Sequence, residues 1–337
     1  MSSRAVTIER PGELRVGAAE PAEPAPGQAL IRVAYSGICG SDREVLTGGR
    51  PEGYVHYPVV PGHEWSGTVV AVGSTKDRSL LDQPVVGEGF RSCQVCESCR
   101  RGDNNLCAAQ YDETGFTRPG AWSDYLVMPA RLLHVLPPES DLRAAAVLEP
   151  AACAAAAALK LDAQPGEKIA VVGGGSLGLL STQLLSATSP AELLVVHPEH
   201  DRAQLAAACG ASALLTPEEA EQRRGEFDAV VEAAGASGTA DLATRLVRPG
   251  GRVVLTGVPS EDTQPPSPVH LVCSQITLHT VFGAPSRAWS HAVRAFAAGV
   301  LDPSLIVTRQ FALDDASEAL RVLAEERAHN VKILLRP

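Results

Sequence analysis

A glycine-rich turn between an apolar strand pattern and a helical pattern constrains the fold of this chain more than any other feature. Residues 169–172 (IAVV) predict a buried strand, and the turn that follows has glycine at the first, third and sixth positions. Such glycines allow a tight turn, close approach of a pyrophosphate and close packing of helix on strand. The phosphates would lie at the positive end of the helix. The pattern predicts a dinucleotide site at Gly173, Gly175, Ser176, Leu177 and Gly178.

Strand and helix patterns alternate around this turn. The predicted strands are 168–172, 192–196, 228–232, 252–257 and 277–282, separated by helical patterns and by a turn at 248–251. This βαβ rhythm predicts a doubly wound parallel sheet, and the chain is therefore of the α/β class.

The end of the second strand departs from the usual dinucleotide pattern. An NAD enzyme normally has an acid there to bind the ribose diol, but this chain has His197. Arg202, together with His197 or His200, could hold a 2′-phosphate, whereas Glu199 or Asp201 could replace the missing acid. The choice between NAD and NADP stays open.

The rest of the chain predicts a second domain. About the first 145 residues are rich in glycine, proline and short β-branched runs such as 29–33 and 68–72. The last fifty or so residues are expected to return to this domain, so that the nucleotide domain is an insertion. We place the first domain at 1–148 and 284–337 and the inserted Rossmann domain at 149–283.

Four cysteines lie close together in a polar segment, 91–108: Cys93, Cys96, Cys99 and Cys107. The segment has almost no apolar content, so burial cannot hold its shape, and a bound metal would supply the folding energy. Two disulfides or free thiols are the alternatives, but close-set cysteines in a large intracellular protein more often hold metal. Four thiolates predict a closed, structural zinc site.

A second metal site is indicated by Cys39 and His63, each in a glycine-flanked loop. A catalytic zinc takes three protein ligands and keeps one position open. The third ligand could be Glu149, in an apolar stretch at the domain junction, or Glu64, next to the histidine. Each residue alone has an ordinary explanation, such as packing, a loop hydrogen bond or a favourable place at a helix N-terminus.

Bulk properties limit the partners. The chain of 337 residues has a formal charge of −10, and its lysines and arginines are scattered, which disfavours nucleic acid and anionic membranes. It has no apolar run of the ~20 residues that span a bilayer and no secretory signal pattern. We expect a cytoplasmic protein that binds small molecules and copies of itself.

Taken together, these motifs resemble the zinc-dependent medium-chain dehydrogenases. The resemblance rests on Cys-Gly-Ser-Asp at 39–42, Pro-Gly-His-Glu-Trp-Ser-Gly at 61–67, the four-cysteine segment, Leu-Glu-Pro at 148–150 and the glycine-rich turn. It covers essentially the whole chain. Within the family, the chain most resembles the polyol and threonine branch, and within that branch the aminocyclitol (2-deoxy-scyllo-inosamine) dehydrogenases.

The resemblance implies a GroES-like catalytic domain, two zinc ions and NAD or NADP, and a homodimer or homotetramer. It makes Cys39 and His63 ligands of the catalytic zinc. Glu149 occupies a position that is cysteine in many relatives. In some relatives the glutamate that corresponds to Glu64 binds the zinc directly, and the one that corresponds to Glu149 binds it through water. Ser41 is expected to take the alcohol proton, with Asp42 positioning the loop.

The expected reaction interconverts a secondary alcohol of a polyol, cyclitol or aminocyclitol with its ketone. Polar candidates for the substrate site are Tyr54, His56, Glu64, Glu113 and Arg118. The near alternative is oxidation of L-threonine, which needs a cation for the substrate carboxylate that the sequence does not single out. The other alternative is a non-catalytic nucleotide-binding protein stabilised by zinc. For the dimer, the strand at 277–282 is the expected contact.

Overall fold

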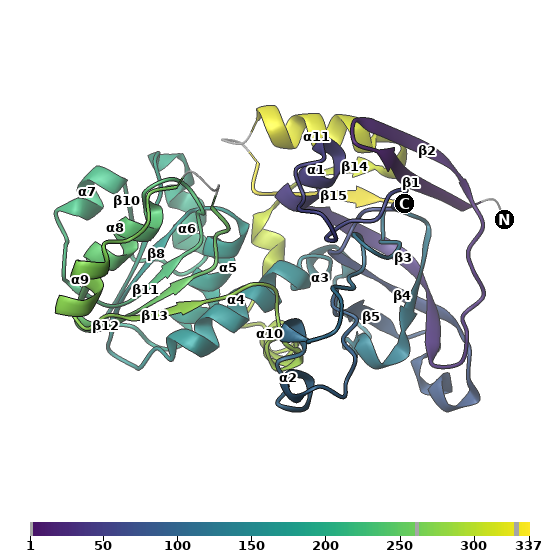
Figure 1. The fold of residues 1–337 in the computed structure, drawn as a ribbon, viewed down its shortest axis with the longest axis horizontal. Coiled ribbons are helices and arrows are strands. Elements are labelled where there is room, and N and C mark those ends of the chain that lie inside the picture. Colours follow the sequence, from purple (N-terminus) through teal and green to yellow (C-terminus); the bar gives the residue numbers. More distant parts are fainter. Residues whose placement is uncertain (1–2, 260–262, 327–329) are drawn as a thin grey trace. The chain divides into compact units, whose positions relative to one another are not determined.

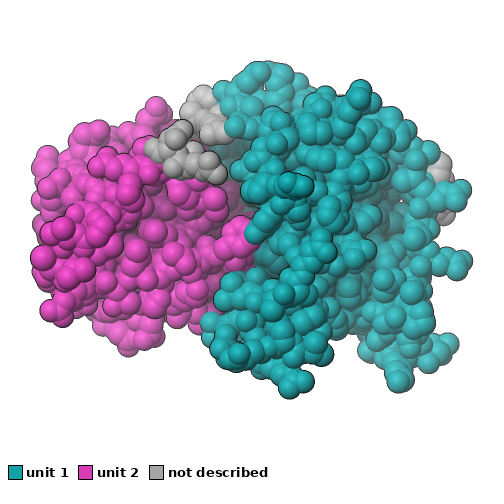
Figure 2. All heavy atoms as spheres, in the orientation of Figure 1, with its two compact units in different colours: residues 1–149, 285–293, 307–337 teal, residues 150–284, 294–306 magenta. Residues whose placement is uncertain are grey.

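The computed structural model describes residues 3–259, 263–326 and 330–337. It forms two compact units (Figures 1 and 2), which we describe separately. The first unit comprises residues 1–149, 285–293 and 307–337, and the second comprises 150–284 and 294–306. Every helix in the described residues is too short or too polar to cross a membrane.

The second unit is built on a six-stranded sheet in the order β10-β9-β8-β11-β12-β13, with all neighbours parallel. Its strands are β8 (Lys168–Val172), β9 (Glu192–Val196), β10 (Ala213–Leu215), β11 (Phe227–Glu232), β12 (Val247–Leu255) and β13 (Thr277–Thr280). The order changes direction between β8 and β11, which is the switch point where α/β proteins bind ligands. The doubly wound α/β fold is thereby confirmed.

Helices connect these strands and cover the sheet. They are α4 (Leu148–Leu161), α5 (Ser176–Ser186), α6 (Ala203–Ala208), α7 (Pro217–Glu221), α8 (Thr239–Leu246) and α9 (Pro268–Cys273), with short 3₁₀ turns at His200–Arg202 and Pro303–Ile306. One core cluster joins β8, β9, β11 and α8 through fully buried side chains such as Phe227, Val230 and Leu246. The strands are buried on both faces, and this explains their unbroken apolar sequences.

Two sequence predictions for this sheet were wrong. The three-residue strand β10 is absent from the prediction, because so short a segment has no readable period. The turn expected at 248–251 lies inside β12, where the pairing with β11 shifts register between Phe227 and Ala229. Gly250 has φ +74° there, so the glycines serve an irregularity in the strand instead of ending it.

The first unit contains a seven-stranded sheet and a separate hairpin. The sheet order is β14-β15-β3-β4-β5-β7, and β6 also pairs with β3. Its strands are β3 (Gln28–Ile38), β4 (Trp65–Val72), β5 (Pro84–Gly87), β6 (Tyr125–Pro129), β7 (Leu133–Val135), β14 (Val307–Ala312) and β15 (Lys332–Arg336), and the hairpin is β1 (Ser3–Arg10) with β2 (Glu13–Ala19). The C-terminal strand β15 pairs with the end of β3, with Ile333 opposite Ile38.

Short helices and turns close this unit. They are α1 (Gly40–Thr47), α2 (Glu97–Arg100), α3 (Leu142–Ala145), α10 (Ser286–Ala297), whose last turn belongs to the second unit, α11 (Ala316–Glu325), and 3₁₀ turns at Thr75–Leu80, Asn104–Leu106, Ala130–Leu132 and Leu313–Asp315. One core cluster packs Trp122 and Ile38 with Ile333 and α11, and another packs Ile31 with Val69 and Met128. These cores fix the ends of β3 and β4, from which the site is built.

Candidate active site

Three candidate metal ligands converge where β3 ends and β4 begins. Cys39 follows the last residue of β3, and His63 and Glu64 directly precede β4. The two strands are antiparallel neighbours with Ser36 opposite Trp65, so the segments after one and before the other meet. A sulfur, an imidazole nitrogen and a carboxylate oxygen of the three side chains lie within 4.8 Å of one another.

Glycines make room for this arrangement. A Cβ on Gly37 would clash with the carboxylate of Glu64. Gly62, before the histidine, has φ +96°, and a Cβ there would clash with the Trp122 ring. Gly37 is therefore required by close packing, and Gly62 by close packing and a left-handed backbone, whereas Gly40, directly after Cys39, has open space around it.

Asp42 holds two of the three ligands in place. It is fully buried in the first turn of α1, and its Oδ2 accepts a hydrogen bond of 2.8 Å from the backbone N–H of Cys39. Its Oδ1 lies 3.5 Å from Nδ1 of His63, an ionic contact between two buried atoms that have no hydrogen-bond partner among the residues that the structure describes. Burial lowers the pKa of His63, but Asp42 and Cys39 more than offset this and raise it well above its usual value. The site therefore stabilises positive charge.

The sequence analysis missed Lys332, the first residue of β15. Its Nζ lies 2.7 Å from Oε1 of Glu64 and also donates to the carbonyl of Ile38 at 3.3 Å, and both charged side chains are buried. The other carboxylate oxygen of Glu64, Oε2, is buried with no hydrogen-bond partner in the described residues. A buried carboxylate oxygen needs a partner, so the donor set fits a cation. The detectable signal was a lysine in an otherwise apolar strand.

The other predicted residues of the site lie nearby without joining this group. Glu149 is the second residue of α4 and is partly buried. Burial raises its pKa to about 7, with smaller contributions from Glu64 and Glu113, while His63 opposes them. Ser41 is partly buried in the first turn of α1, two residues from Cys39.

A cluster of aromatic and charged side chains lies beside His63. The Phe116 ring packs against the imidazole with centroids 4.9 Å apart, and the Arg50 guanidinium lies 4.3 Å from the centroid of the same phenyl ring. Of the predicted wall residues, Glu113 is buried in this cluster. Arg50 and Tyr111 were missed, since no local pattern marks either of them.

The other wall candidates are less enclosed. Tyr54 is 38% exposed and packs on Tyr111 with ring centroids 4.6 Å apart. His56 is exposed and donates its backbone N–H to the carbonyl of Phe116. Arg118 points to solvent and pairs with Asp112 at 2.9 Å, which makes it a surface residue.

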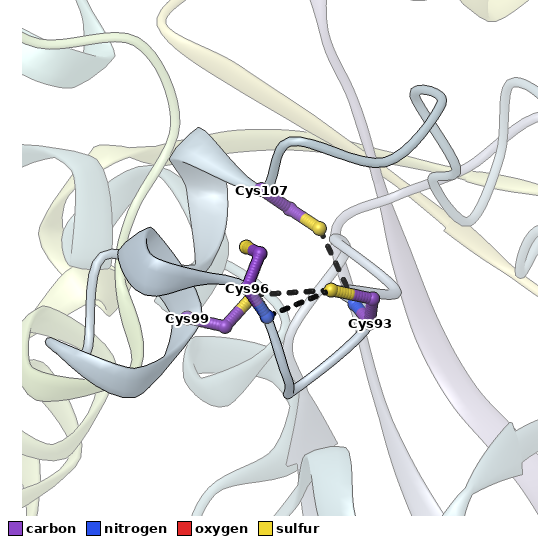
Figure 3. A group of neighbouring side chains, drawn as sticks. All are labelled: Cys93, Cys96, Cys99 and Cys107. Carbon is purple, nitrogen blue, oxygen red and sulfur yellow. Dashed lines mark hydrogen bonds between the residues drawn. The ribbon is translucent and has the colours of Figure 1, made fainter.

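The four cysteines of the segment 91–108 form a second group (Figure 3), with their sulfurs within 4.8 Å of one another. Backbone N–H groups point at these sulfurs: that of Cys93 at Cys107, that of Cys96 at Cys93 and that of Ala108 at Cys96, at 3.3 to 3.5 Å. Backbone hydrogen bonds from Ala108 and Cys99 lower the pKa of Cys96 to about 6. The group has the donor set of a closed zinc site.

The glycine-rich turn joins β8 to α5 in the second unit. Gly173 has φ +120°, and a Cβ on Gly178 would collide with the Gly173 carbonyl. Glycine is therefore needed at both positions, and Ser176 begins the helix. At the end of β9, the His197 ring lies 3.0 Å from where a Cβ on Gly174 would be. Arg202 is buried nearby, with Nε 4.0 Å from Asp201.

Comparisons with known proteins agree with this geometry. Residues 25–138 match the family model "Alcohol dehydrogenase GroES-like domain", and residues 176–298 match "Zinc-binding dehydrogenase". The chain is 28% identical to a sorbitol dehydrogenase of Bacillus subtilis (strain 168), over 92% of this chain and 90% of the relative.

Two further proteins are similar over nearly their whole length. The chain is 31% identical to a Mycobacterium tuberculosis protein named "probable zinc-binding alcohol dehydrogenase", over 99% of this chain and 88% of the relative. A crystal structure of a protein described as a "putative zinc-binding dehydrogenase" from Sinorhizobium meliloti 1021, bound to NADP, superposes with a TM-score of 0.92 at 28% identity, and the match covers 100% of both chains.

Proposed function

We propose that this chain, which belongs to the zinc-dependent medium-chain alcohol dehydrogenase family, interconverts a secondary alcohol of a polyol, cyclitol or aminocyclitol with its ketone. The observation that carries the proposal is the convergence of Cys39, His63 and Glu64 with a buried carboxylate oxygen left unpartnered. A site of three ligands leaves room for a substrate oxygen, whereas a storage or structural site has four.

The enzyme uses zinc and a nicotinamide dinucleotide. When bound, the metal lowers the pKa of a coordinated alcohol as a Lewis acid, and the nicotinamide accepts the hydride. Every other part of the reaction depends on how the chain positions these groups.

The ligand roles follow from the contacts. In our proposal Cys39, His63 and Oε2 of Glu64 hold the catalytic metal. Lys332 fixes the carboxylate through its other oxygen, and Asp42 fixes the imidazole and the cysteine backbone. Glu149 remains outside the ligand group and positions the substrate or a water molecule beside it.

Ser41 is our candidate for proton transfer. It lies in the first turn of α1, two residues past Cys39, and a hydroxyl can accept a proton from the alcohol while donating its own. Glu44, which is exposed, is not needed for this step.

We also propose the following domain boundaries. Residues 1–148 and 284–337 form the catalytic domain with its cysteine segment, and 149–283 form the nucleotide domain. Support comes from the first family model, which matches 25–138, and from the second, which matches 176–298 and so extends past the proposed boundary at 283. The residues proposed to bind NAD or NADP are Gly173, Gly175, Ser176, Leu177, Gly178, His197 and Arg202.

A homodimer is the proposed assembly, formed through the edge of the nucleotide sheet. Strand β13 ends the sheet, so that its outer edge pairs with no described strand. Leu278 on this strand is 37% exposed, and Val269 and Val272 of α9 are exposed by 72% and 75%. Unpaired strand edges and exposed apolar groups favour association. A monomeric mass in sedimentation equilibrium would refute this assembly, and a tetrameric mass would require a second interface.

A cytoplasmic location completes the proposal. All eight cysteines are free of disulfides, as expected in a reducing compartment.

The test of the function is a reduced-cofactor absorbance assay with the zinc-loaded protein. Polyols, aminocyclitols and secondary alcohols are offered with NAD and with NADP, and the zinc content of the same sample is measured. The proposal predicts turnover of an alcohol and zinc near two per chain. Nucleotide binding with one zinc and no turnover of any alcohol would instead support the non-catalytic alternative.

A further inference from the structure

A buried chain of polar side chains beside the metal ligands has no part in the reaction described above. The Arg50 guanidinium donates to the Tyr111 hydroxyl at 3.2 Å, and this hydroxyl in turn donates to Oε2 of Glu113. Glu113 is only 6% exposed and the side chain of Arg50 11%. Burying a carboxylate and a guanidinium costs free energy of desolvation unless the two groups are well paired or bind a ligand.

This chain of residues lies next to the reacting centre. Phe116, over which Arg50 packs, contacts the ring of the metal-ligand candidate His63. The carboxylate of Glu113 acts electrostatically on that imidazole and on Glu149. The residues 113–116 also contact the loop before β4, because a Cβ on Gly115 would lie 3.0 Å from the backbone N of His63. A substrate bound at the metal would therefore have Glu113 close to it.

One oxygen of Glu113 is left for a ligand. Tyr111 occupies Oε2, whereas Oε1 has no hydrogen bond to any residue in the described part of the chain. Gly89 flanks this oxygen: a Cβ there would lie 3.0 Å from Oε1, so that glycine keeps the space beside it open. Burial raises the pKa of Glu113, against the effects of His63, Tyr111 and Arg50. A further hydrogen-bond donor at Oε1 would offset the cost of burial.

The neighbouring cation is less suited to a ligand. Arg50 already donates to Tyr111, packs its face on Phe116 and lies 3.5 Å from Glu44. A substrate carboxylate placed here would approach Glu113, and like charges at short range repel. The cluster therefore favours a donor group on the substrate over an anionic one.

Resting on the proposed function, we propose that Glu113 selects substrates that carry a hydrogen-bond donor, a hydroxyl or an ammonium, on the carbon next to the reacting one. Its Oε1 accepts a hydrogen bond from that donor, while Tyr111 and Arg50 hold the carboxylate in place. The substrate class is a vicinal diol or amino alcohol without a carboxylate, which excludes L-threonine as the preferred substrate.

The experiment compares three cyclohexane substrates that differ only in the neighbouring group. They are cyclohexanol, trans-cyclohexane-1,2-diol and trans-2-aminocyclohexanol, and L-threonine is the fourth. We expect the wild-type enzyme to prefer the diol or the amino alcohol over cyclohexanol in kcat/KM by roughly 10-fold or more, the range of a hydrogen bond to a charged group.

Two variants separate the two donors. Glu113→Gln keeps a carbonyl oxygen but removes the charge, so it should reduce the preference for the amino alcohol by about 10- to 100-fold and that for the diol by less. Glu113→Leu removes the acceptor and should abolish both preferences. The matched control is Asp112→Asn, which changes the adjacent, surface-paired carboxylate and should leave the ratios unchanged.

Each remaining outcome counts against one of the two proposals. Equal kcat/KM for cyclohexanol and the two donor-bearing substrates, or ratios that Glu113→Leu leaves unchanged, would overturn the role of Glu113 while the alcohol dehydrogenase activity stands. A preference for L-threonine over trans-2-aminocyclohexanol would also overturn it. No turnover of any alcohol by the zinc-loaded wild type would contradict the proposed function itself. Circular dichroism melting would show whether the variants are folded. Calorimetric binding of trans-2-aminocyclohexanol would show whether the affinities of the wild type and the variants follow the same order as their kcat/KM values.

Discussion

The two groups of metal ligands in the first unit depend on the fold in opposite ways. The cysteine segment has little core of its own: Val95 and Leu106 are 66% and 59% exposed, and its two helical turns are three and four residues long. The site at Cys39, His63 and Glu64 lies instead between strands of a packed sheet, and the histidine and glutamate are buried. A bound metal therefore supplies the shape of the first group, whereas the sheet supplies the shape of the second.

The two groups also differ in the number and chemical type of their metal ligands. Four sulfurs surround one position and leave no place for substrate, and backbone N–H groups support them. The open site has one sulfur, one imidazole and one carboxylate, each fixed by a neighbour such as Asp42 or Lys332. The comparison predicts that losing a ligand costs stability in the segment and activity in the open site.

The largest effect is expected for Cys99→Ser in the cysteine segment. Loss of one thiolate weakens a metal whose binding contributes on the order of 10 kcal/mol to the folding of such segments. We expect one zinc fewer per chain and a clear fall in melting temperature, measured by calorimetry, before any specific kinetic effect. A variant that melts like the wild type would break the proposed dependence of the segment on its metal. Cys273→Ser, at an exposed cysteine outside both groups, is the control.

Cys39→Ser should have the next largest effect, on turnover instead of stability. A serine hydroxyl does not replace the thiolate as a zinc ligand, while the packed strands on either side remain. We expect turnover to fall below detection with a melting temperature close to that of the wild type. Unfolding of this variant, with activity retained by Cys99→Ser, would mean that the two sites have been assigned the wrong way round.

Lys332→Met sharpens the comparison, because it tests whether Lys332 compensates the charge of Glu64 in the open site when no metal is bound. Removing one partner of a buried ion pair costs about 3–5 kcal/mol when the other charge is left uncompensated. A zinc ion on Glu64 would compensate that charge. The variant should therefore lose more stability in the metal-free protein than in the zinc-loaded protein, as measured by denaturant titration of both. An equal loss in both forms would show that Glu64 does not contact the metal.

The smallest effect is expected for Asp42→Asn. The amide can still accept the hydrogen bond from Cys39, but it removes a negative charge 3.5 Å from His63. Such a loss beside a metal ligand lowers metal affinity or activity by roughly 10- to 100-fold. Competition with a chromophoric chelator would measure the affinity. Unchanged affinity and unchanged kcat/KM would indicate that this carboxylate only caps the start of α1.

What the sequence could predict was local. The glycine-rich turn, the cysteine spacing and the loops around Cys39 and His63 are short motifs, and they were sufficient for the fold class and for the two ligand groups. The choice between Glu64 and Glu149 depends on where side chains point, so spacing left it open. The structure brings only the first of the two into the group with Cys39 and His63.

The contacts that the sequence analysis missed join distant parts of the chain. Lys332 meets Glu64 across 268 positions, through the pairing of β15 with β3. Arg50 meets Tyr111 across 61 positions, between two loops without a regular pattern. Contacts of this kind depend on strand register and loop packing, which apolar periodicity does not reveal.

The most direct test of the account is to count zinc before and after mild chelation of the folded enzyme. The account predicts two zinc ions per chain as isolated, of which the chelator removes one together with turnover. The melting temperature should change little, and activity should return when zinc is added back. A protein that binds only one zinc would contradict the presence of a closed structural site and an open catalytic site in one chain. So would a protein that unfolds when the first zinc leaves and whose remaining zinc supports no turnover.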